Sequence, residues 1–189
     1  MSQPPSAAIS DNAEYSPEER TALLQLAHDA IGARLRGEKL DFTPPNEHLA
    51  ERRGAFTTLH REGQLRGCIG YVFPVATLYQ TVAETAVAAA FEDPRFYPLQ
   101  ASEAPQLKIE ISVLSRIQPI EAEAVEVGKH GLVVTYQGRR GLLLPQVPIE
   151  LGWEREMFLA QTCVKAGVPG DAWKKGAKLE AFTAEVFGE

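Results

Sequence analysis

The sequence is poor in cysteine and histidine, the side chains on which cystine frameworks and zinc sites depend. Among its 189 residues are two cysteines, Cys68 and Cys163, and four histidines. Two thiols cannot build a disulfide framework, which excludes a cystine-stabilised miniprotein. The histidines are scattered, and none has zinc-finger or HExxH spacing. We therefore predict no metal site.

The chain also lacks an excess of basic charge and any long apolar run. Its 19 Lys and Arg are outnumbered by 25 Asp and Glu, for a formal net charge of −6. Nucleic-acid binding requires clustered cations, so this balance argues against a nucleic-acid partner. No stretch has the roughly 18 apolar residues of a membrane span, and residues 1–12 lack the pattern of a signal peptide. We expect a cytoplasmic protein without membrane association, whose thiols are free.

The composition is that of a globular domain, with 44% hydrophobic and 23% charged residues. Residues 1–14 have little apolar content and are predicted to form a disordered arm. The remainder, 15–189, is long enough for one domain of two subdomains. We predict a larger subdomain from 15–75 and 128–189, with a smaller one, 76–127, inserted into it.

Local signals predict helices and one strand. The run Ser16-Pro17-Glu18-Glu19 is typical of a capped helix start, and Gly37 of a helix end. An alanine-rich helix is predicted over 76–92 and another helix over 153–166. Residues 107–114 alternate between apolar and polar, as in a strand with one buried face.

Two hairpins complete the pattern. The runs 55–60 and 65–73 are joined through Glu62-Gly63, a pair that suits a tight turn. The runs 131–136 and 141–144 form a second hairpin, and 179–187 a closing strand. Hairpins mixed with helices, without regular βαβ alternation, predict an α+β fold with a mixed or largely antiparallel sheet and packed helices.

The most unusual run is LRGCIG at residues 65–70. In a strand, Arg66 and Cys68 share one face, and a guanidinium beside a thiol lowers the pKa of that thiol. Gly67 and Gly70 allow a ligand or another backbone to approach closely. One interpretation is a catalytic Cys68, with Arg66, Gly67 and Gly70 as ligand contacts. The other is that Cys68 is a small buried hydrophobe in a sheet.

A cysteine nucleophile needs a base on the same face of the strand. Constant-sum pairing across the Glu62-Gly63 turn places Cys68 opposite Thr57 and His60 on the other face, unless a β-bulge shifts the register. His130, before Gly131, is an alternative base, although a histidine before a turn glycine is more often an exposed loop residue, so the sequence predicts no nucleophilic triad.

Four further positions have alternative interpretations. Arg95 can hold an anionic ligand or simply pair with Asp93. Glu110 can act as a base in a cleft, although its place on the polar face of a strand favours solvent. Gln146 can bind a ligand or satisfy the backbone of a loop. Cys163, at helical spacing with other apolar residues, is predicted to be structural.

The LRGCIG run resembles the signature of the AMMECR family. The resemblance extends from about residue 16 to the end of the chain through six ordered blocks. Position 71 departs from it, since Tyr71 stands where many relatives have a small residue or Thr. The other blocks are GAFTTL at 54–59, DPRF at 93–96, LKIEISVLS at 107–115, LLPQV at 143–147, and GW at 152–153 with CVKAG at 163–167 and the terminal Trp173 region.

The resemblance implies an α+β protein of two subdomains that flank a groove, with the signature near that groove. It implies no settled activity and no known cofactor, so whether the chain is an enzyme stays open. Prokaryotic relatives look like one component of a three-part system with a Memo-like protein and a radical SAM protein, which would then be partners. Three functions remain: such a component with a ligand groove near Arg66 and Cys68, a protein-binding adaptor without catalysis, or a thiol-dependent enzyme acting on an anionic small molecule.

Overall fold

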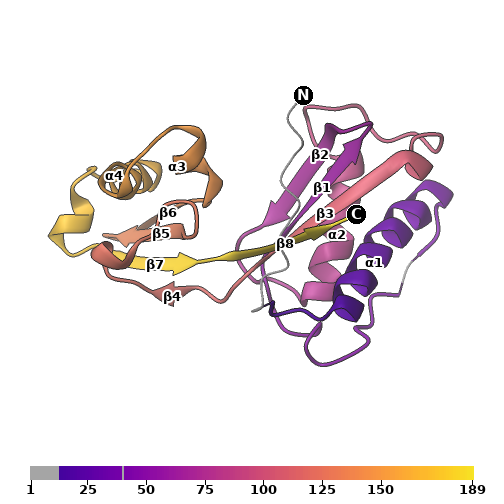
Figure 1. Cartoon of the computed structure of the whole chain (residues 1–189), viewed down its shortest axis with the longest axis horizontal. Coiled ribbons are helices and arrows are strands. Elements are labelled where there is room, and N and C mark those ends of the chain that lie inside the picture. The colour runs from indigo at the N-terminus through magenta and orange to yellow at the C-terminus, as the bar shows by residue number, and fades with distance from the viewer. Residues whose placement is uncertain (1–12, 40) are drawn as a thin grey trace. The chain divides into compact units, whose positions relative to one another are not determined.

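The computed structural model of the protein describes residues 13–39 and 41–189. The chain divides into two compact units. Unit 1 comprises the described residues up to Ser112 together with Glu185–Glu189, and unit 2 is Val113–Ala184. Both units are shown in Figure 1. The smaller unit thus begins at Val113 and not at residue 76 as predicted, because the alanine-rich helix packs within unit 1.

Unit 1 has two helices over a four-stranded sheet with strand order β2-β1-β3-β8. Most of the predicted arm lies outside the described residues. Within it, the backbone N–H of Glu14 donates to a carboxylate oxygen of Glu185 at 2.7 Å, which ties this residue to β8. The elements are α1 (Pro17–Arg36), β1 (Ala55–Arg61), β2 (Gln64–Tyr71), α2 (Leu78–Phe91), the 3₁₀ turn η1 (Ala104–Gln106), β3 (Leu107–Leu114) and β8 (Ala184–Gly188).

The ends of α1 follow from local chemistry. The Ser16 side chain accepts from the Glu19 backbone N–H, and the Glu19 carboxylate accepts from the Ser16 N–H. This capping box satisfies two donors that have no partner within the helix. Gly37 ends the helix in the left-handed region with φ 69°. Both predicted ends are confirmed.

Alternate residues of the unit 1 sheet point to its two faces, and the helices cover only one of them. On the covered face Thr57 Oγ1 lies 2.8 Å from Thr85 Oγ1 of α2, and both residues are buried. Gly67 is buried on the same face. The other face carries half-buried side chains, including Thr58, Cys68 and Glu110. Cys68 therefore lies on the open face of the sheet.

The β1–β2 hairpin contains a β-bulge that corrects the predicted register. Its turn is as expected, with Glu62 and Gly63 at φ 53° and 75°. However, Leu59 pairs with Gly67 whereas His60 pairs with Leu65, which leaves Arg66 as the extra residue. As a result Cys68 pairs with Thr58 and not with Thr57.

Unit 2 is a second four-stranded sheet, with order β4-β7-β5-β6, packed against α4. Cys163 is fully buried with Val134 in its core, as the sequence predicts. The predicted closing strand 179–187 is two strands, one in each sheet. The elements of unit 2 are β4 (Gln118–Pro119), η2 (Ala122–Ala124), β5 (Gly131–Tyr136), β6 (Arg139–Leu143), α3 (Gln146–Glu150), α4 (Arg155–Lys165), η3 (Ala172–Lys175) and β7 (Lys178–Phe182).

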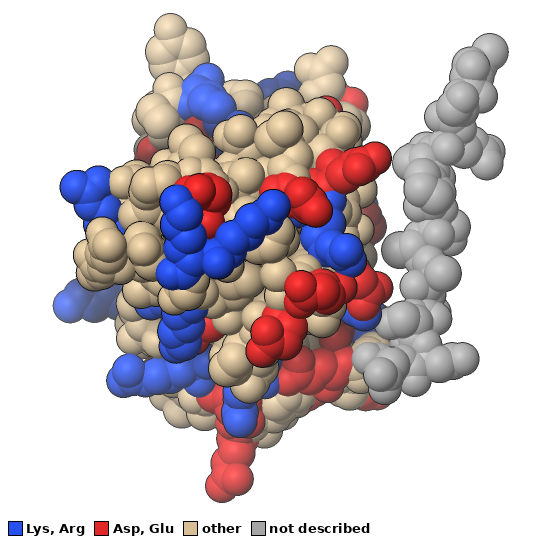
Figure 2. Space-filling view, turned by 90° about the vertical axis from the view of Figure 1, so that its left-hand side faces the viewer, with Lys and Arg blue, Asp and Glu red and all other residues tan. Residues whose placement is uncertain are grey.

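The α+β fold is confirmed, with antiparallel pairing of β1 with β2, of β5 with β6 and β7, and of β4 with β7. Within residues 13–39 and 41–189, no helix combines the length and the apolar character needed to cross a bilayer. On the face shown in Figure 2, Lys and Arg side chains are interspersed with Asp and Glu. This face therefore lacks the uninterrupted basic surface typical of nucleic-acid binding.

Candidate functional site

Three arginines of unit 1 line one pocket of about 680 Å³ beside the β1–β2 hairpin and the segment after α2. Arg61 comes from the end of β1, Arg66 from the β2 bulge and Arg95 from the segment after α2. Such a volume is within the usual range of small-molecule sites. The remaining lining residues are Phe96, Tyr97, Pro98, Gln100, Ser102, Glu103 and Gln106.

Glu103 organises two of these arginines. Its carboxylate accepts from Arg66 Nε at 3.0 Å and Nη2 at 3.1 Å, and from Arg61 Nη1 at 2.9 Å. It also accepts from the backbone N–H of Gln100 at 2.8 Å. The hydrogen bonds from Arg66 are the main reason that the pKa of Glu103 falls to about 2. Glu103 is therefore ionised at neutral pH and holds both guanidinium groups in fixed positions.

Arg66 keeps one donor without an acceptor. Its Nη2 also donates to the Tyr97 carbonyl at 2.9 Å, and its guanidinium carbon lies 5.8 Å from the centre of the Phe96 ring. Its Nη1 is buried and has no hydrogen-bond partner among the described residues. A buried donor without an acceptor costs about 1–3 kcal/mol. An acceptor oxygen supplied by a ligand would remove that cost.

Arg95 pairs with Asp93, which was one of the two predicted alternatives. It also lines the pocket. Its Nε and Nη2 donate to the two carboxylate oxygens at 3.0 and 2.7 Å, and these bonds are the main cause of the lowered pKa of Asp93. The Arg95 side chain is nevertheless 55% exposed. The guanidinium carbon of Arg95 lies 5.5 Å from the centre of the Phe96 ring, so this ring lies near the guanidinium groups of both Arg66 and Arg95. The guanidinium of Arg95 is thus held by Asp93 through Nε and Nη2, while the side chain remains accessible.

Cys68 lies beside this site but does not line the pocket. Its backbone N–H donates to Asp93 Oδ2 at 2.9 Å, and Thr58 Oγ1 donates to its sulfur at 3.3 Å. The predicted partnership with Arg66 needs correction, because the hydrogen bonds of Arg66 go to Glu103 and Tyr97. The cation that interacts electrostatically with the thiol is Arg95, whose raised pKa owes most to Asp93 and least to Cys68.

Internal packing accounts for both glycines of the signature. A Cβ on Gly67 would overlap the carbonyl oxygen of Ala89 in α2, and one on Gly70 would overlap the Phe56 ring. At Gly67 the close approach is therefore made by another backbone and not by a ligand. The missing side chain of Gly70 likewise makes room for a neighbour in the sheet.

The other two candidates are not part of the pocket. Glu110 is half-buried on the polar face of β3, opposite the buried Ile109 and Ile111. Gln146 is exposed at the start of α3 and belongs to unit 2, whereas the three arginines belong to unit 1. Among the described residues, no group of three His, Cys, Asp or Glu is arranged to hold a metal ion.

Reasoning from sequence missed Arg61, Tyr97 and Glu103. Arg61 and Glu103 are 42 positions apart, and each is an ordinary polar residue within its own segment. The sequence offered one signal for Tyr97, since this residue directly follows the recognised DPRF block, and in the structure it is 91% exposed. An exposed aromatic side chain next to arginines is typical of binding surfaces.

Comparisons with known proteins identify relatives over most of the chain. A family model described as AMMECR1 matches residues 24–187. A protein of Methanopyrus kandleri is 42% identical, covering 91% of this chain and 89% of its own. A protein of Thermococcus gammatolerans is 43% identical, covering 88% of each chain. The crystal structure of the uncharacterised protein PH0010 from Pyrococcus horikoshii has a TM-score of 0.71 at 40% identity, covering 89% of this chain and 90% of that one.

Proposed function

The chain belongs to the AMMECR1 family, and we propose a function from the pocket itself. Unit 1 binds an anionic oxygen ligand, a carboxylate or a phosphate, through Arg66 and Arg95. The observation that carries this proposal is the buried Nη1 of Arg66, which lacks an acceptor in a pocket lined by two further arginines.

The arginines suit such a ligand because they are already positioned. Guanidinium groups match the geometry of carboxylate and phosphate oxygens and bind them through paired hydrogen bonds. Glu103 and Asp93 hold Arg66 and Arg95 before any ligand arrives. Binding therefore needs little ordering of long side chains, which would otherwise weaken the affinity. The exposed ring of Tyr97 adds a surface on which an apolar part of the ligand can pack.

Isothermal titration calorimetry with inorganic phosphate and phenyl phosphate tests the proposal. We expect Arg66→Gln to weaken binding of both probes about tenfold, the loss of one charge-assisted hydrogen bond. The control is Arg52→Gln, which removes an exposed arginine of unit 1 outside the pocket and leaves affinity unchanged. Phenyl phosphate binds more tightly than phosphate if Tyr97 contributes. Absence of binding by the folded protein, or equal weakening in both variants, contradicts the proposal.

A thiol-dependent enzyme is the second candidate function. It is favoured by the position of Cys68 next to Arg95 and by the hydrogen bond from Thr58 to its sulfur. If the thiol acts on the bound anion, phenyl phosphate slows alkylation of Cys68 by iodoacetamide in the native protein. Unchanged alkylation at saturating phenyl phosphate would leave Cys68 outside the reaction and favour a binding role alone.

The family resemblance supports one further part of the proposal, a role as a cytoplasmic component of a system with a Memo-like and a radical SAM protein. Co-elution of the purified chain with these two proteins from the same genome, in size-exclusion chromatography, tests it. We expect a complex that contains the chain. Independent elution of all three, with and without phenyl phosphate, contradicts this role. A complex that forms equally well with Arg66→Gln favours the adaptor function over ligand binding.

A further inference from the structure

A second cavity of about 510 Å³ lies in unit 1, over adjoining faces of α1 and α2, and shares no residue with the arginine pocket. Its apolar lining consists mainly of alanines, Ala30 and Ala33 from α1 and Ala83 and Ala88 from α2. Methyl side chains at these positions leave the space between the helices unfilled. The volume falls in the range of small-molecule sites.

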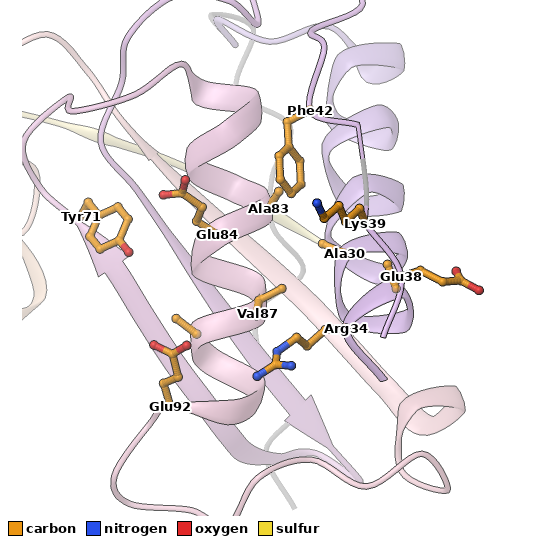
Figure 3. A pocket seen from close by; sticks show the side chains of 12 residues that line it. Ala30, Arg34, Glu38, Lys39, Phe42, Tyr71, Ala83, Glu84, Val87 and Glu92 are labelled. Atoms are coloured by element: carbon orange, nitrogen blue, oxygen red, sulfur yellow. The ribbon is translucent and has the colours of Figure 1, made fainter. Parts of the chain in front are cut away.

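An aromatic and an aliphatic side chain extend this apolar surface. In Figure 3 the Phe42 ring reaches down toward Ala83, and Val87 points from α2 into the same space. Phe42 is 37% exposed and Val87 is half-buried. Burial of these side chains by an apolar ligand would remove their surface from water, which stabilises a complex by about 25 cal/mol per Å².

The charges around the cavity are separated by sign. Figure 3 shows Lys39 and Arg34 on the α1 side of α2, next to Phe42 and Val87. The Glu38 side chain points away from the cavity, and its carboxylate forms an ion pair with Nε of Arg36 at 2.8 Å. Glu84 and Glu92 lie on the opposite side of α2, toward Tyr71. The cations and the apolar surface thus meet in the space between the helices.

Within residues 13–39 and 41–189, neither cation has a carboxylate partner. No ion pair joins Arg34 or Lys39 to another described residue, although the Arg34 guanidinium carbon lies 5.8 Å from the centre of the Phe91 ring. We propose that this cavity binds an amphiphilic organic anion, with its apolar body between Phe42, Ala83 and Val87 and its acidic group at Arg34 and Lys39. The proposal is independent of the arginine pocket.

Titration with decanoate, followed by NMR signals of the alanine and valine methyl groups, tests the proposal. We expect saturable shifts of the Ala83 and Val87 methyl signals. Arg34→Gln weakens decanoate binding about fivefold, the effect of losing one partly exposed charge pair. Val87→Trp fills the cavity from the helix surface and abolishes the shifts, while circular dichroism shows that the variant is folded. The control is Arg52→Gln, which removes an exposed arginine of unit 1 that lines neither cavity and leaves the affinity unchanged.

A probe of opposite charge separates the apolar from the ionic part of the proposal. Decyltrimethylammonium has the same chain length and is expected to bind at least fivefold more weakly than decanoate. Equal affinity for the two probes, or equal decanoate affinity of wild type and Arg34→Gln, overturns the assignment of an anion. Shifts that do not saturate, or that persist in the folded Val87→Trp variant, overturn the cavity as the site. Arg66→Gln leaves decanoate binding here unchanged, so this result does not depend on the proposed function.

Discussion

The backbone N–H of Cys68 donates to Oδ2 of Asp93 at 2.9 Å, and the same carboxylate holds the guanidinium of Arg95. The edge strand β2 is thereby joined to the segment that follows α2. Asp93 is only 4% exposed, so these donors replace water around its charge. One buried carboxylate thus fixes both the position of Arg95 and the edge of the strand that carries the thiol.

Replacement of Asp93 by Asn should therefore lower the free energy of unfolding by about 2 kcal/mol, because the Cys68 N–H and the Arg95 guanidinium lose a charged, buried acceptor. Guanidinium chloride unfolding measures the change. The neighbouring control is Glu92→Gln, which removes an exposed carboxylate and is expected to change stability by less than about 0.5 kcal/mol. Equal effects of the two substitutions would mean that the Asp93 network contributes nothing specific.

Stability should also depend on pH through Glu103 and Asp93. Folding lowers the pKa of Glu103 from 4.5 to about 2, mainly through the hydrogen bonds from Arg66, and lowers that of Asp93 mainly through Arg95. A carboxyl group whose pKa is lower in the folded state stabilises the protein above its unfolded pKa. That stability is lost as the pH falls through the folded pKa.

Unfolding free energies measured from pH 6 down to pH 2 should therefore decrease as the pH falls below 4.5. The Glu103→Gln variant has a lower free energy of unfolding than wild type at pH 6, and this difference becomes small near pH 2. A constant difference across this range would show that Glu103 does not titrate as the structure requires.

Two glycine substitutions should change stability in opposite directions. Gly67→Ala places a methyl group against the Ala89 carbonyl and should destabilise the protein by about 1–3 kcal/mol. Gly32→Ala in α1 meets only the flexible end of Arg36 and should stabilise the protein by about 0.5–1 kcal/mol. Thermal unfolding of both variants provides the comparison. A neutral Gly67→Ala would argue against the close packing of α2 on β2.

The two thiols should react at different rates in the native protein. Cys163 is fully buried, and burial raises the pKa of its thiol. Cys68 is half-buried on the open face of the sheet. Mass spectrometry after brief iodoacetamide treatment should find Cys68 labelled and Cys163 protected until denaturant is added. Preferential labelling of Cys163 would contradict the described core of unit 2.

Local chemistry explains which parts of the fold could be predicted from sequence. Ser16, Glu19 and Gly37 mark the ends of α1 because capping involves neighbours in the chain. The register of β1–β2 could not be predicted in the same way. The bulge residue, Arg66, is bonded to Glu103, which lies 37 positions further on, and no local pattern marks that contact.

Contacts between residues far apart in the sequence also determine the closing strand and the candidate site. The sequence predicts one closing strand over 179–187, but β7 and β8 pair in different sheets, because pairing partners are set by tertiary structure. Arg66 and Arg95 were predicted as ligand contacts from their blocks. Glu103, which positions Arg66, was not predicted as part of the site, because the sequence around a carboxylate on an irregular segment does not indicate its distant partners.

The measurement that tests the central claim most directly is NMR observation of the arginine Nε–Hε signals during titration with phenyl phosphate. The account predicts saturable shifts for Arg66 and Arg95, with Arg52 in unit 1 and Arg139 in unit 2 unaffected, since neither of these lines the pocket. Shifts of equal size at all four arginines, or none at Arg66 and Arg95, would contradict an anion site in this pocket.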